Sequence, residues 1–233
     1  MIDVKYDGRY GNRLFQYFMA VVIAEKHKQE ISNPFPTAID DLKYNYKEDP
    51  PRSEKIEIND KNYNTFLTCK KVHANIHLVG YFQKKEVIAE FIKRKDRLFS
   101  NIGCKKPIRG TYVHLRLGDL LAHPERYCPL SYYEKALKKV DLDGELYLSS
   151  DSPEHPIVQS LISKYNFKIL NLNEEKTILT ASRFDNKILS LGTFSWWIGF
   201  LGNQKNVVCP NLRDYSGWHG KIFPCLDWKI SSC

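Results

Sequence analysis

Long apolar runs and repeats are missing from this chain. No stretch approaches the roughly 18 consecutive apolar residues that a membrane span requires, so we expect no transmembrane helix. The start of the chain has no basic region followed by an apolar core and a small-residue cleavage site. If this is the native start, we expect a cytoplasmic protein with no anchor. The chain also has no internal repeat and no low-complexity segment.

Cysteine is sparse and irregularly spaced. The six cysteines form no CxxC pair, which argues against a zinc site, and reduced thiols are the expectation for a cytosolic chain. Asp141 and Asp143 match a metal-binding DxD pattern, but they follow a predicted helix in a loop that contains glycine. We interpret them as a turn and predict no metal site.

The composition is that of a folded, soluble protein with a basic charge balance. Of the 233 residues, 42% are hydrophobic and 27% are charged, which suffices for one large domain or two small α/β domains. The net charge of +8 suits an anionic ligand, either nucleic acid, an acidic membrane or a phosphate-bearing small molecule. The short basic clusters at 93–95 and 105–106 are interpreted as solvated surface, in preference to a nucleic-acid patch.

Strand and helix signals alternate regularly through the second half of the chain. The predicted strands are 111–117, 145–149, 167–172, 187–191 and 206–209, and the predicted helices are 131–140, 156–165, 176–184 and 194–201. Ser131, with Glu134 three residues further on, is predicted to cap the first of these helices. Strands separated by helices of about ten residues indicate a doubly wound, mostly parallel sheet.

The first half of the chain is less regular. The predicted elements are a strand at 2–6, a helix at 12–28, a strand at 76–82 and a helix at 85–99, with loops through 33–65. Glycine and proline in 101–110 predict a boundary there. We therefore predict an N-terminal α/β domain at 1–108 and a C-terminal Rossmann-like domain at 109–233.

Three strand-to-helix segments carry candidate site residues. In the first, Gly8 and Gly11 permit positive φ and a close backbone approach to a ligand, and the helix N-terminus that follows favours an anion. The structural alternative is a tight turn in which Asn12 caps the helix. The residues of this turn are Gly8, Arg9, Gly11 and Asn12.

The second segment is the predicted strand that ends in VHLRLGD. Alternate residues of a strand share a face, so His114 and Arg116 point the same way near the carboxyl end, where doubly wound folds open onto a ligand crevice. A buried Arg needs an anion, and its planar fork matches a pyrophosphate. The structural alternative is that Arg116 pairs with Asp119 across the turn.

The third segment is GTFSWW. Thr193 and Ser195 can donate hydroxyls to phosphate oxygens together with the free amides at a helix N-terminus. The alternative is a helix cap followed by an aromatic core face. For Trp196 and Trp197 we prefer the core.

In this order, the segments GxxGNxLFQY, GYFQ (80–83), VHxRxGD, YYxKA (132–136), LYLSSD and TFSWW resemble the α-1,2-fucosyltransferases of glycosyltransferase family 11. They also look like the wider superfamily of protein O-fucosyltransferases and α-1,6-fucosyltransferases. The likeness covers most of the chain except 33–65, and TFSWW with HxRxGD is its specific pair.

The resemblance implies a glycosyltransferase-B fold, in which two Rossmann-like, doubly wound domains hold the nucleotide in the cleft between them. It implies inverting, metal-independent transfer of fucose from GDP-fucose to a hydroxyl of an acceptor glycan, with no cofactor. The partners are then a nucleotide-sugar donor and a glycan acceptor, not nucleic acid, and no particular oligomeric state is predicted.

The resemblance also implies roles for single residues. Arg116 would hold the β-phosphate and stabilise the departing nucleotide, and His114 would lie beside it against ribose or phosphate. The phosphate pocket would be lined by Thr193, Phe194 and Ser195. The donor sugar and pyrophosphate would be approached from the opposite domain by Gly8, Arg9, Gly11 and Asn12.

The chain departs from the family pattern at two positions. Leu117 stands where the family has a second basic residue, and we expect its side chain to face away from His114 and Arg116. Thr177 stands where the family has an acidic residue, and in related enzymes an Asp of this region reads guanine. Either Glu174 or Glu175 takes that role or the base is read differently.

Several alternatives follow from these residues. A base could remove the proton of the acceptor hydroxyl, and the candidates are Asp119, His123 and Glu125. The donor could instead carry another deoxyhexose, such as rhamnose, on a different nucleotide. A non-enzymatic rival is a basic module that binds nucleic acid or an acidic glycan, with strongly salt-dependent affinity.

Overall fold

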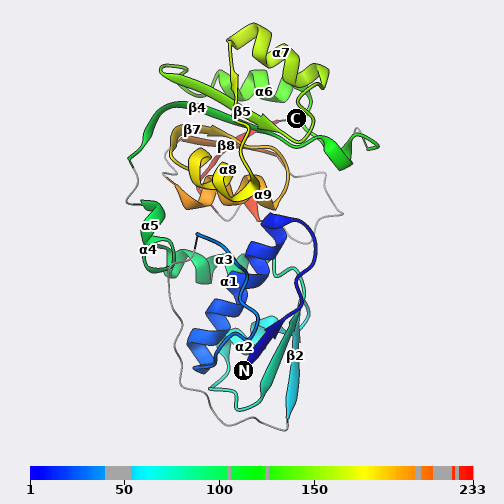
Figure 1. Cartoon of the computed structure of the whole chain (residues 1–233), viewed down its shortest axis with the longest axis vertical. Helices are drawn as coiled ribbons and strands as arrows, with labels where there is room; N and C mark the ends of the chain where they lie inside the picture. The colour runs from blue at the N-terminus through cyan, green and yellow to red at the C-terminus, as the bar shows by residue number, and fades with distance from the viewer. Residues whose placement is uncertain are drawn as a thin grey trace. The chain divides into compact units, whose positions relative to one another are not determined.

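The computed structural model describes residues 1–39, 54–103, 106–123, 126–202, 206–211, 222–223 and 226–232. They belong to two compact units, the first comprising Met1–Leu98 with His219–Cys225 and the second Phe99–Trp218 with Leu226–Cys233. Each unit is built on a parallel sheet (Figure 1). The α/β class is therefore confirmed, and the glycosyltransferase-B arrangement of the two units stays a prediction.

The first unit has a three-stranded parallel sheet in the order β1-β3-β2. Its strands are β1 (Ile2–Val4), β2 (Lys55–Asn59) and β3 (Asn75–Val79). Its helices are α1 (Tyr10–His27), α2 (Tyr63–Thr68), α3 (Lys85–Lys93) and α4 (Lys95–Leu98). The loops expected at 33–65 thus include a strand, and the helix expected at 85–99 is two helices.

Helix α1 begins earlier than its sequence pattern predicts. Its N-cap is Arg9, which makes no side-chain capping bond, so Asn12 lies inside the first turn and the capping alternative is wrong. Every residue from Leu14 to Glu25 is buried. A helix that is buried on all sides is the core of its unit.

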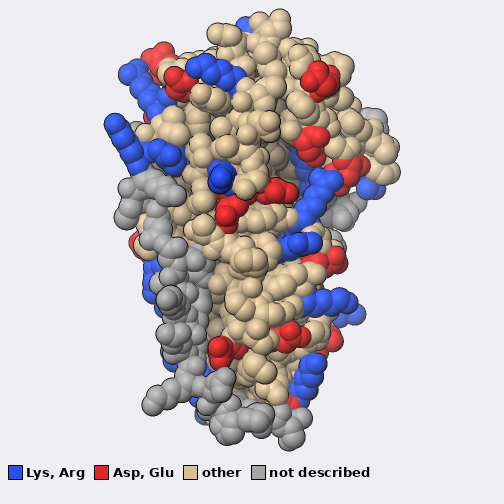
Figure 2. Space-filling view, viewed as in Figure 1, with Lys and Arg blue, Asp and Glu red and all other residues tan. Residues whose placement is uncertain are grey.

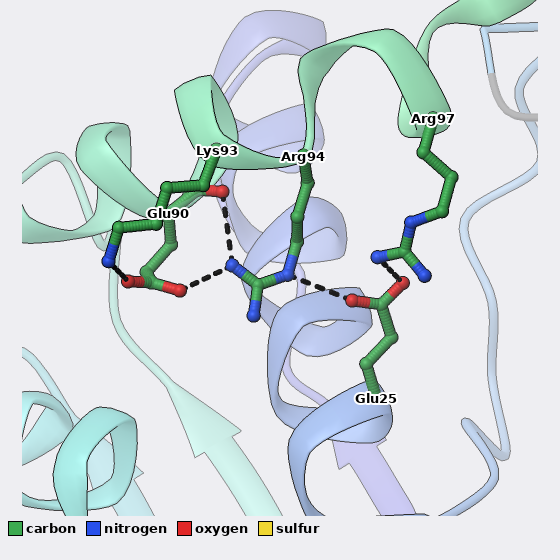
Figure 3. A network of polar contacts seen from close by, with 5 residues as sticks. All are labelled: Glu25, Glu90, Lys93, Arg94 and Arg97. Carbon is green, nitrogen blue, oxygen red and sulfur yellow. Dashed lines mark hydrogen bonds and ion pairs between the residues drawn. The ribbon is translucent and has the colours of Figure 1, made fainter.

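The charged side chain of Glu25 is fastened inside the first unit by two arginines. Arg94 donates from Nε to Glu25 Oε2 at 2.9 Å and also pairs with Glu90, while Arg97 pairs with the other oxygen of Glu25 (Figure 3). Arg94 is only 22% exposed, whereas Lys93 is 67% exposed. The interpretation as solvated surface is therefore correct for Lys93 and wrong for Arg94, which ties α3 to α1.

The second unit has a six-stranded parallel sheet in the order β6-β5-β4-β7-β8-β9. Its strands are β4 (Ile108–Leu115), β5 (Glu145–Ser150), β6 (Lys168–Ile169), β7 (Phe184–Ile188), β8 (Asn206–Pro210) and β9 (Lys229–Ser231). From β4 the chain winds to one edge through β5 and β6, and from β7 it winds to the other. The doubly wound prediction is confirmed for this unit.

Helices cover both faces of this sheet. The helices of the second unit are α5 (Ser100–Gly103), the short 3₁₀ helix η1 (Gly118–Leu120), α6 (Leu130–Leu137), α7 (Pro156–Tyr165), α8 (Glu174–Ala181) and α9 (Thr193–Leu201). Helices α6 and α7 lie on one face, and α8 and α9 lie on the other (Figure 1). Val113 and Leu115 of β4 belong to the core that includes α6 and α7 residues. Since strand residues alternate, His114 faces the α9 side.

The aromatic residues of α9 form core, as preferred from the sequence. Trp196 and Trp197 are fully buried. The ring of Trp196 stacks on Phe200 with centroids 4.6 Å apart. None of the helices in the described part of the chain is long and apolar enough to cross a membrane.

Two local predictions in this unit are wrong for identifiable reasons. Helix α6 starts at Leu130 with Pro129 as its N-cap, so Ser131 caps nothing, and Glu134 pairs with Lys164 at 2.6 Å instead. Strand β7 starts at Phe184, three residues before the predicted strand. Asp185 and Asn186 interrupt the apolar pattern at its start, and Asn186 is buried because its side chain donates to the carbonyl of Asp141 at 2.6 Å.

Candidate functional site

The candidate site lies at the carboxyl ends of β4 and β7. In doubly wound sheets, ligands bind outside the carboxyl ends of the strands, where the winding direction reverses. Here that point lies between β4 and β7, which are neighbours in the sheet. Arg116 follows β4 directly, and Ser190 and Gly192 follow β7. Two of the three predicted site segments therefore end at the same edge of one sheet.

His114 joins these two segments. Its side chain is 8% exposed, and its Nδ1 lies 2.5 Å from Ser195 Oγ and 3.1 Å from Ser190 Oγ. The Phe194 ring lies against it with centroids 5.0 Å apart. Burial lowers the pKa of His114 from 6.5 to about 4, against the raising effect of Asp151 and with a smaller lowering effect of Arg116. His114 is therefore neutral near pH 7.

Two buried serines complete this contact. Ser195 Oγ accepts a hydrogen bond from the amide of Ser190 at 3.1 Å, and Ser190 Oγ accepts one from the amide of Arg116 at 3.1 Å. Ser195 is fully buried, and its hydroxyl is bonded within the protein. Sequence reasoning missed Ser190. A hydroxyl residue between the last apolar residues of a parallel strand and a glycine-initiated helix is the signal that could have found it.

Arg116 lies across the turn that begins α9. Its Nη2 donates to Asp119 Oδ2 at 3.1 Å, which is the pair considered as its structural alternative. A Cβ on Gly192 would lie 2.6 Å from Arg116 Nη1, and Gly192 has φ of 111°. The guanidinium thus rests on a backbone position that favours glycine, next to the N-terminus of α9.

A carboxylate from the next strand holds the turn after Arg116. Asp151 follows β5, and its Oδ1 accepts hydrogen bonds from the amides of Leu117 at 2.8 Å and Gly118 at 3.0 Å. The Leu117 side chain is fully buried in the core, which confirms that it faces away from the site. Like Ser190, Asp151 was given no role from the sequence, although it is the last residue of the LYLSSD segment.

The remaining candidates of the second unit have more ordinary surroundings. Thr193 is the first residue of α9 and is 5% exposed. Glu174 and Glu175 form the first turn of α8, while the buried hydroxyl of Thr177 donates to the carbonyl of Leu172 at 3.2 Å. Of the candidate bases, Asp119 and His123 are exposed, and Glu125 lies outside the described residues.

The first unit gathers its candidates at the carboxyl edge of its own sheet. Gly8 has φ of 75°, as its turn requires. Asn12 accepts a hydrogen bond at Oδ1 from Gln83 Nε2 at 3.1 Å, so the GxxGN and GYFQ segments meet. Gln16 accepts from the amide of Asp7 and donates to the carbonyl of Gly80 at 3.0 Å. Arg9 is exposed at the N-cap, and Gly11 is buried.

The DxD pair precedes β5, at the amino edge of the second unit's sheet. The amide of Asp143 donates to Asp141 Oδ1 at 3.1 Å, which confirms a turn, and Asp143 pairs with Arg109 at 3.3 Å. These residues border a cavity of about 310 Å³ at the amino ends of the strands, the edge opposite Arg116. In the part of the chain that the structure describes, no three His, Cys, Asp or Glu side chains are placed to hold a metal.

The comparisons with known proteins give one distant relative. No family model matches the chain, and no solved structure matches it. The chain is similar to the O-antigen biosynthesis glycosyltransferase WbnK of Escherichia coli, with 24% identity over 132 residues. The match covers 52% of this chain and 44% of that relative, so it spans less than half of the relative's length. It supports a relationship to glycosyltransferases.

Proposed function

We propose that this protein is an inverting glycosyltransferase that moves fucose from GDP-fucose to a hydroxyl of an acceptor glycan without a metal ion. The convergence of VHLRLGD, LYLSSD and TFSWW at the switch point of one parallel sheet carries the proposal. Arg116, Asp151 and Ser195 represent these segments there. The similarity to a named glycosyltransferase supports the transferase class, and the fucose donor rests on the family resemblance.

The arrangement suits the departure of a nucleotide diphosphate. As the acceptor hydroxyl attacks, the sugar passes through an oxocarbenium-like state and negative charge builds on the leaving phosphate. Arg116 can place its planar fork on that phosphate, and the amide end of α9 adds partial positive charge. The Ser190 hydroxyl holds the backbone of Arg116, and Gly192 permits the turn that begins α9, so both groups are in position before the reaction starts.

Asp119 supplies a counter-charge and a candidate base. Its carboxylate pairs with Arg116 at 3.1 Å and is 44% exposed, so the pair is open to exchange with an incoming phosphate. We propose that Asp119 then receives the proton of the acceptor hydroxyl. In the first unit, Gly8, Arg9, Gly11 and Asn12 are proposed to contact the donor sugar and pyrophosphate.

The test is transfer of labelled fucose from GDP-fucose to candidate glycans in the presence of excess EDTA. We expect product in the chelator and a larger rise in melting temperature with GDP than with UDP or TDP. Loss of activity in EDTA that manganese restores would contradict the metal-independent mechanism, and equal shifts with all three nucleotides would contradict the guanine donor.

One observation favours a different nucleotide-sugar donor as a second candidate. Thr177 stands at the position of the family's acidic residue, is buried, and donates its hydroxyl to Leu172. If Glu174 or Glu175 reads guanine instead, changing both to Gln should weaken GDP binding far more than UDP binding. If neither does, a different nucleotide carrying another deoxyhexose such as rhamnose should give the larger melting shift.

A further inference from the structure

We propose that Ser190 and Ser195 are positioning residues that hold His114 in one neutral tautomer, with its proton on Nε2. His114 then presents a hydrogen-bond donor, and not a base, to an acceptor oxygen of the ligand at this site. The proposed function supplies the identity of that ligand, a nucleotide sugar. The tautomer itself follows from contacts inside the protein.

The contacts of the two hydroxyls form one closed set. Ser195 Oγ accepts from the Ser190 amide at 3.1 Å, and Ser190 Oγ accepts from the Arg116 amide at 3.1 Å. The two oxygens lie 3.1 Å apart. His114 Nδ1 lies 2.5 Å from Ser195 Oγ and 3.1 Å from Ser190 Oγ. Ser190 Oγ also lies 3.5 Å from the Leu191 carbonyl, at the limit of hydrogen-bond distance.

Counting protons separates the two tautomers. If Nδ1 accepts, Ser195 donates to it at 2.5 Å and Ser190 donates to Ser195 at 3.1 Å, so every hydroxyl proton has a near acceptor. If Nδ1 donates to Ser195, the Ser195 proton must go to Ser190. The Ser190 proton is then left with the Leu191 carbonyl at 3.5 Å. The first arrangement has the better geometry at each step, so it is favoured.

The other ring nitrogen lacks such a partner. Among the residues that the structure describes, no protein group makes a hydrogen bond with His114 Nε2, although the side chain is only 8% exposed. Nε2 is not among the buried side-chain atoms that lack a partner in the described residues, so it lies open to solvent or to a ligand. An acceptor oxygen of a bound ligand would satisfy it.

A neutral donor complements the charge of Arg116. The charged groups that act on the ring are Asp151, after β5, and Arg116, two residues along its own segment, and burial disfavours the imidazolium. A second cation here would have to lose its hydration beside the first. A neutral N–H adds a directed bond to the ligand without that cost. The acceptor's proton must then go to a group other than His114.

The tautomer can be observed directly in the unmodified protein. After labelling with ¹⁵N-histidine, long-range ¹H–¹⁵N NMR spectra distinguish the protonated from the unprotonated ring nitrogen. The chain has seven histidines, and His114→Gln assigns the signal by removing it. We expect the proton on Nε2 at neutral pH. A proton on Nδ1, or a charged ring at neutral pH, would overturn the proposal.

The serine variants test whether these hydroxyls set the tautomer. In Ser195→Ala we expect a mixture of both tautomers and about tenfold weaker GDP binding, because a single hydrogen bond is misplaced. Ser195→Thr restores the hydroxyl and should restore both signals. Ser182→Ala is the matched control, since Ser182 is fully buried and donates to Leu179 outside this set. It should change neither the tautomer nor the affinity.

An unaltered tautomer in both Ser195→Ala and Ser190→Ala would overturn the positioning role. If Ser195→Ala does not fold, the unmodified protein and Ser190→Ala decide the question. The outcome is separable from the proposed function. A protein with the Nε2 tautomer that binds no nucleotide would contradict the transferase and leave the serine–histidine inference standing. Active transfer with the proton on Nδ1 would support the transferase and contradict the serine–histidine inference.

Discussion

The carboxyl edges of the two sheets are fastened in different ways. In the first unit, loops are tied by long amide side chains, with Gln16 bridging Asp7 and Gly80 and Gln83 reaching Asn12. In the second unit, the ties at His114 are short serine hydroxyls bonded to backbone amides. A serine loses less rotamer entropy on ordering than a glutamine.

This difference indicates that the carboxyl edge of the second sheet is better organised than that of the first before a ligand binds. The short hydroxyls of Ser190, which follows β7, and of Ser195, in α9, leave His114 little freedom, while the first unit's turn relies on side chains with several rotatable bonds. We therefore expect changes at Arg116 and its turn in the second unit to act mainly on catalytic rate, and changes in the first unit to act mainly on affinity. On the face in Figure 2, Lys and Arg are interspersed with Asp and Glu.

The largest expected effect comes from Arg116→Ala. The guanidinium is expected to strengthen its contact as charge builds on the leaving phosphate, so its loss should lower the transfer rate by roughly 100- to 1000-fold. Steady-state kinetics would measure the rate, and circular dichroism the fold. Arg116→Lys should restore little, because an ammonium cannot make the two-pronged contact.

Asp119→Asn separates this role from a structural one. If the Arg116–Asp119 pair serves only stability, both variants should lower the melting temperature to a similar extent. A folded Arg116→Ala protein with near-normal turnover would contradict the expectation that the second unit's edge controls the catalytic rate.

The next effect concerns pH. The unfolded chain binds a proton at His114 near pH 6.5, whereas the folded protein resists protonation until about pH 4. The contribution of neutral His114 to the free energy of unfolding is therefore fully present above pH 6.5. As the pH falls toward 4, the free energy of unfolding decreases by about 3 kcal/mol in all. Urea unfolding of the unmodified protein and His114→Gln across this window would measure the difference. Parallel pH profiles of the two proteins would contradict the buried, neutral His114.

A smaller effect is expected from Gly192→Ala. The φ of 111° and ψ of 161° at Gly192 belong to a region that is almost restricted to glycine. We expect a loss of about 2 kcal/mol in the free energy of unfolding. The transfer rate should also fall, since the new Cβ would displace Arg116. Gly199→Ala, which meets Leu189 and Trp228 instead, is a control for crowding in the same helix. An unchanged rate in a destabilised Gly192→Ala protein would show that Arg116 is not positioned by this turn.

The smallest effect is expected in the first unit. Gln16→Leu should remove the hydrogen bond to the partly buried carbonyl of Gly80 and cost about 1 kcal/mol of stability. It should raise KM while kcat changes little. Gln29→Leu is its match, because Gln29 is also buried and donates to Val72 and Ala74 at the opposite edge of the same sheet. A fall in kcat for Gln16→Leu as large as that for Arg116→Ala would remove the contrast between the two edges.

The sequence by itself determined the features that depend on local pattern. Alternating strand and helix signals specify the parallel sheet of the second unit, because each periodicity reports which local face is buried. The positive φ of Gly8 and the core position of Trp196 and Trp197 follow in the same way. Asp185 and Asn186 at the start of β7 defeated this reasoning, because the burial of Asn186 depends on its hydrogen bonds to Thr111 and Asp141 and not on its own hydropathy.

Only the tertiary structure decided which residues meet. Ser195 lies 81 positions from His114 in the chain, and Asp151 lies 33 positions from Gly118. No local periodicity contains these pairings, because strand order and the reversal of winding between β4 and β7 bring them together. The protonation state of His114 is decided at the same level. The neutral ring of a histidine can carry its proton on either nitrogen, and the buried hydroxyls of Ser190 and Ser195 remove one of these choices by requiring an acceptor at Nδ1.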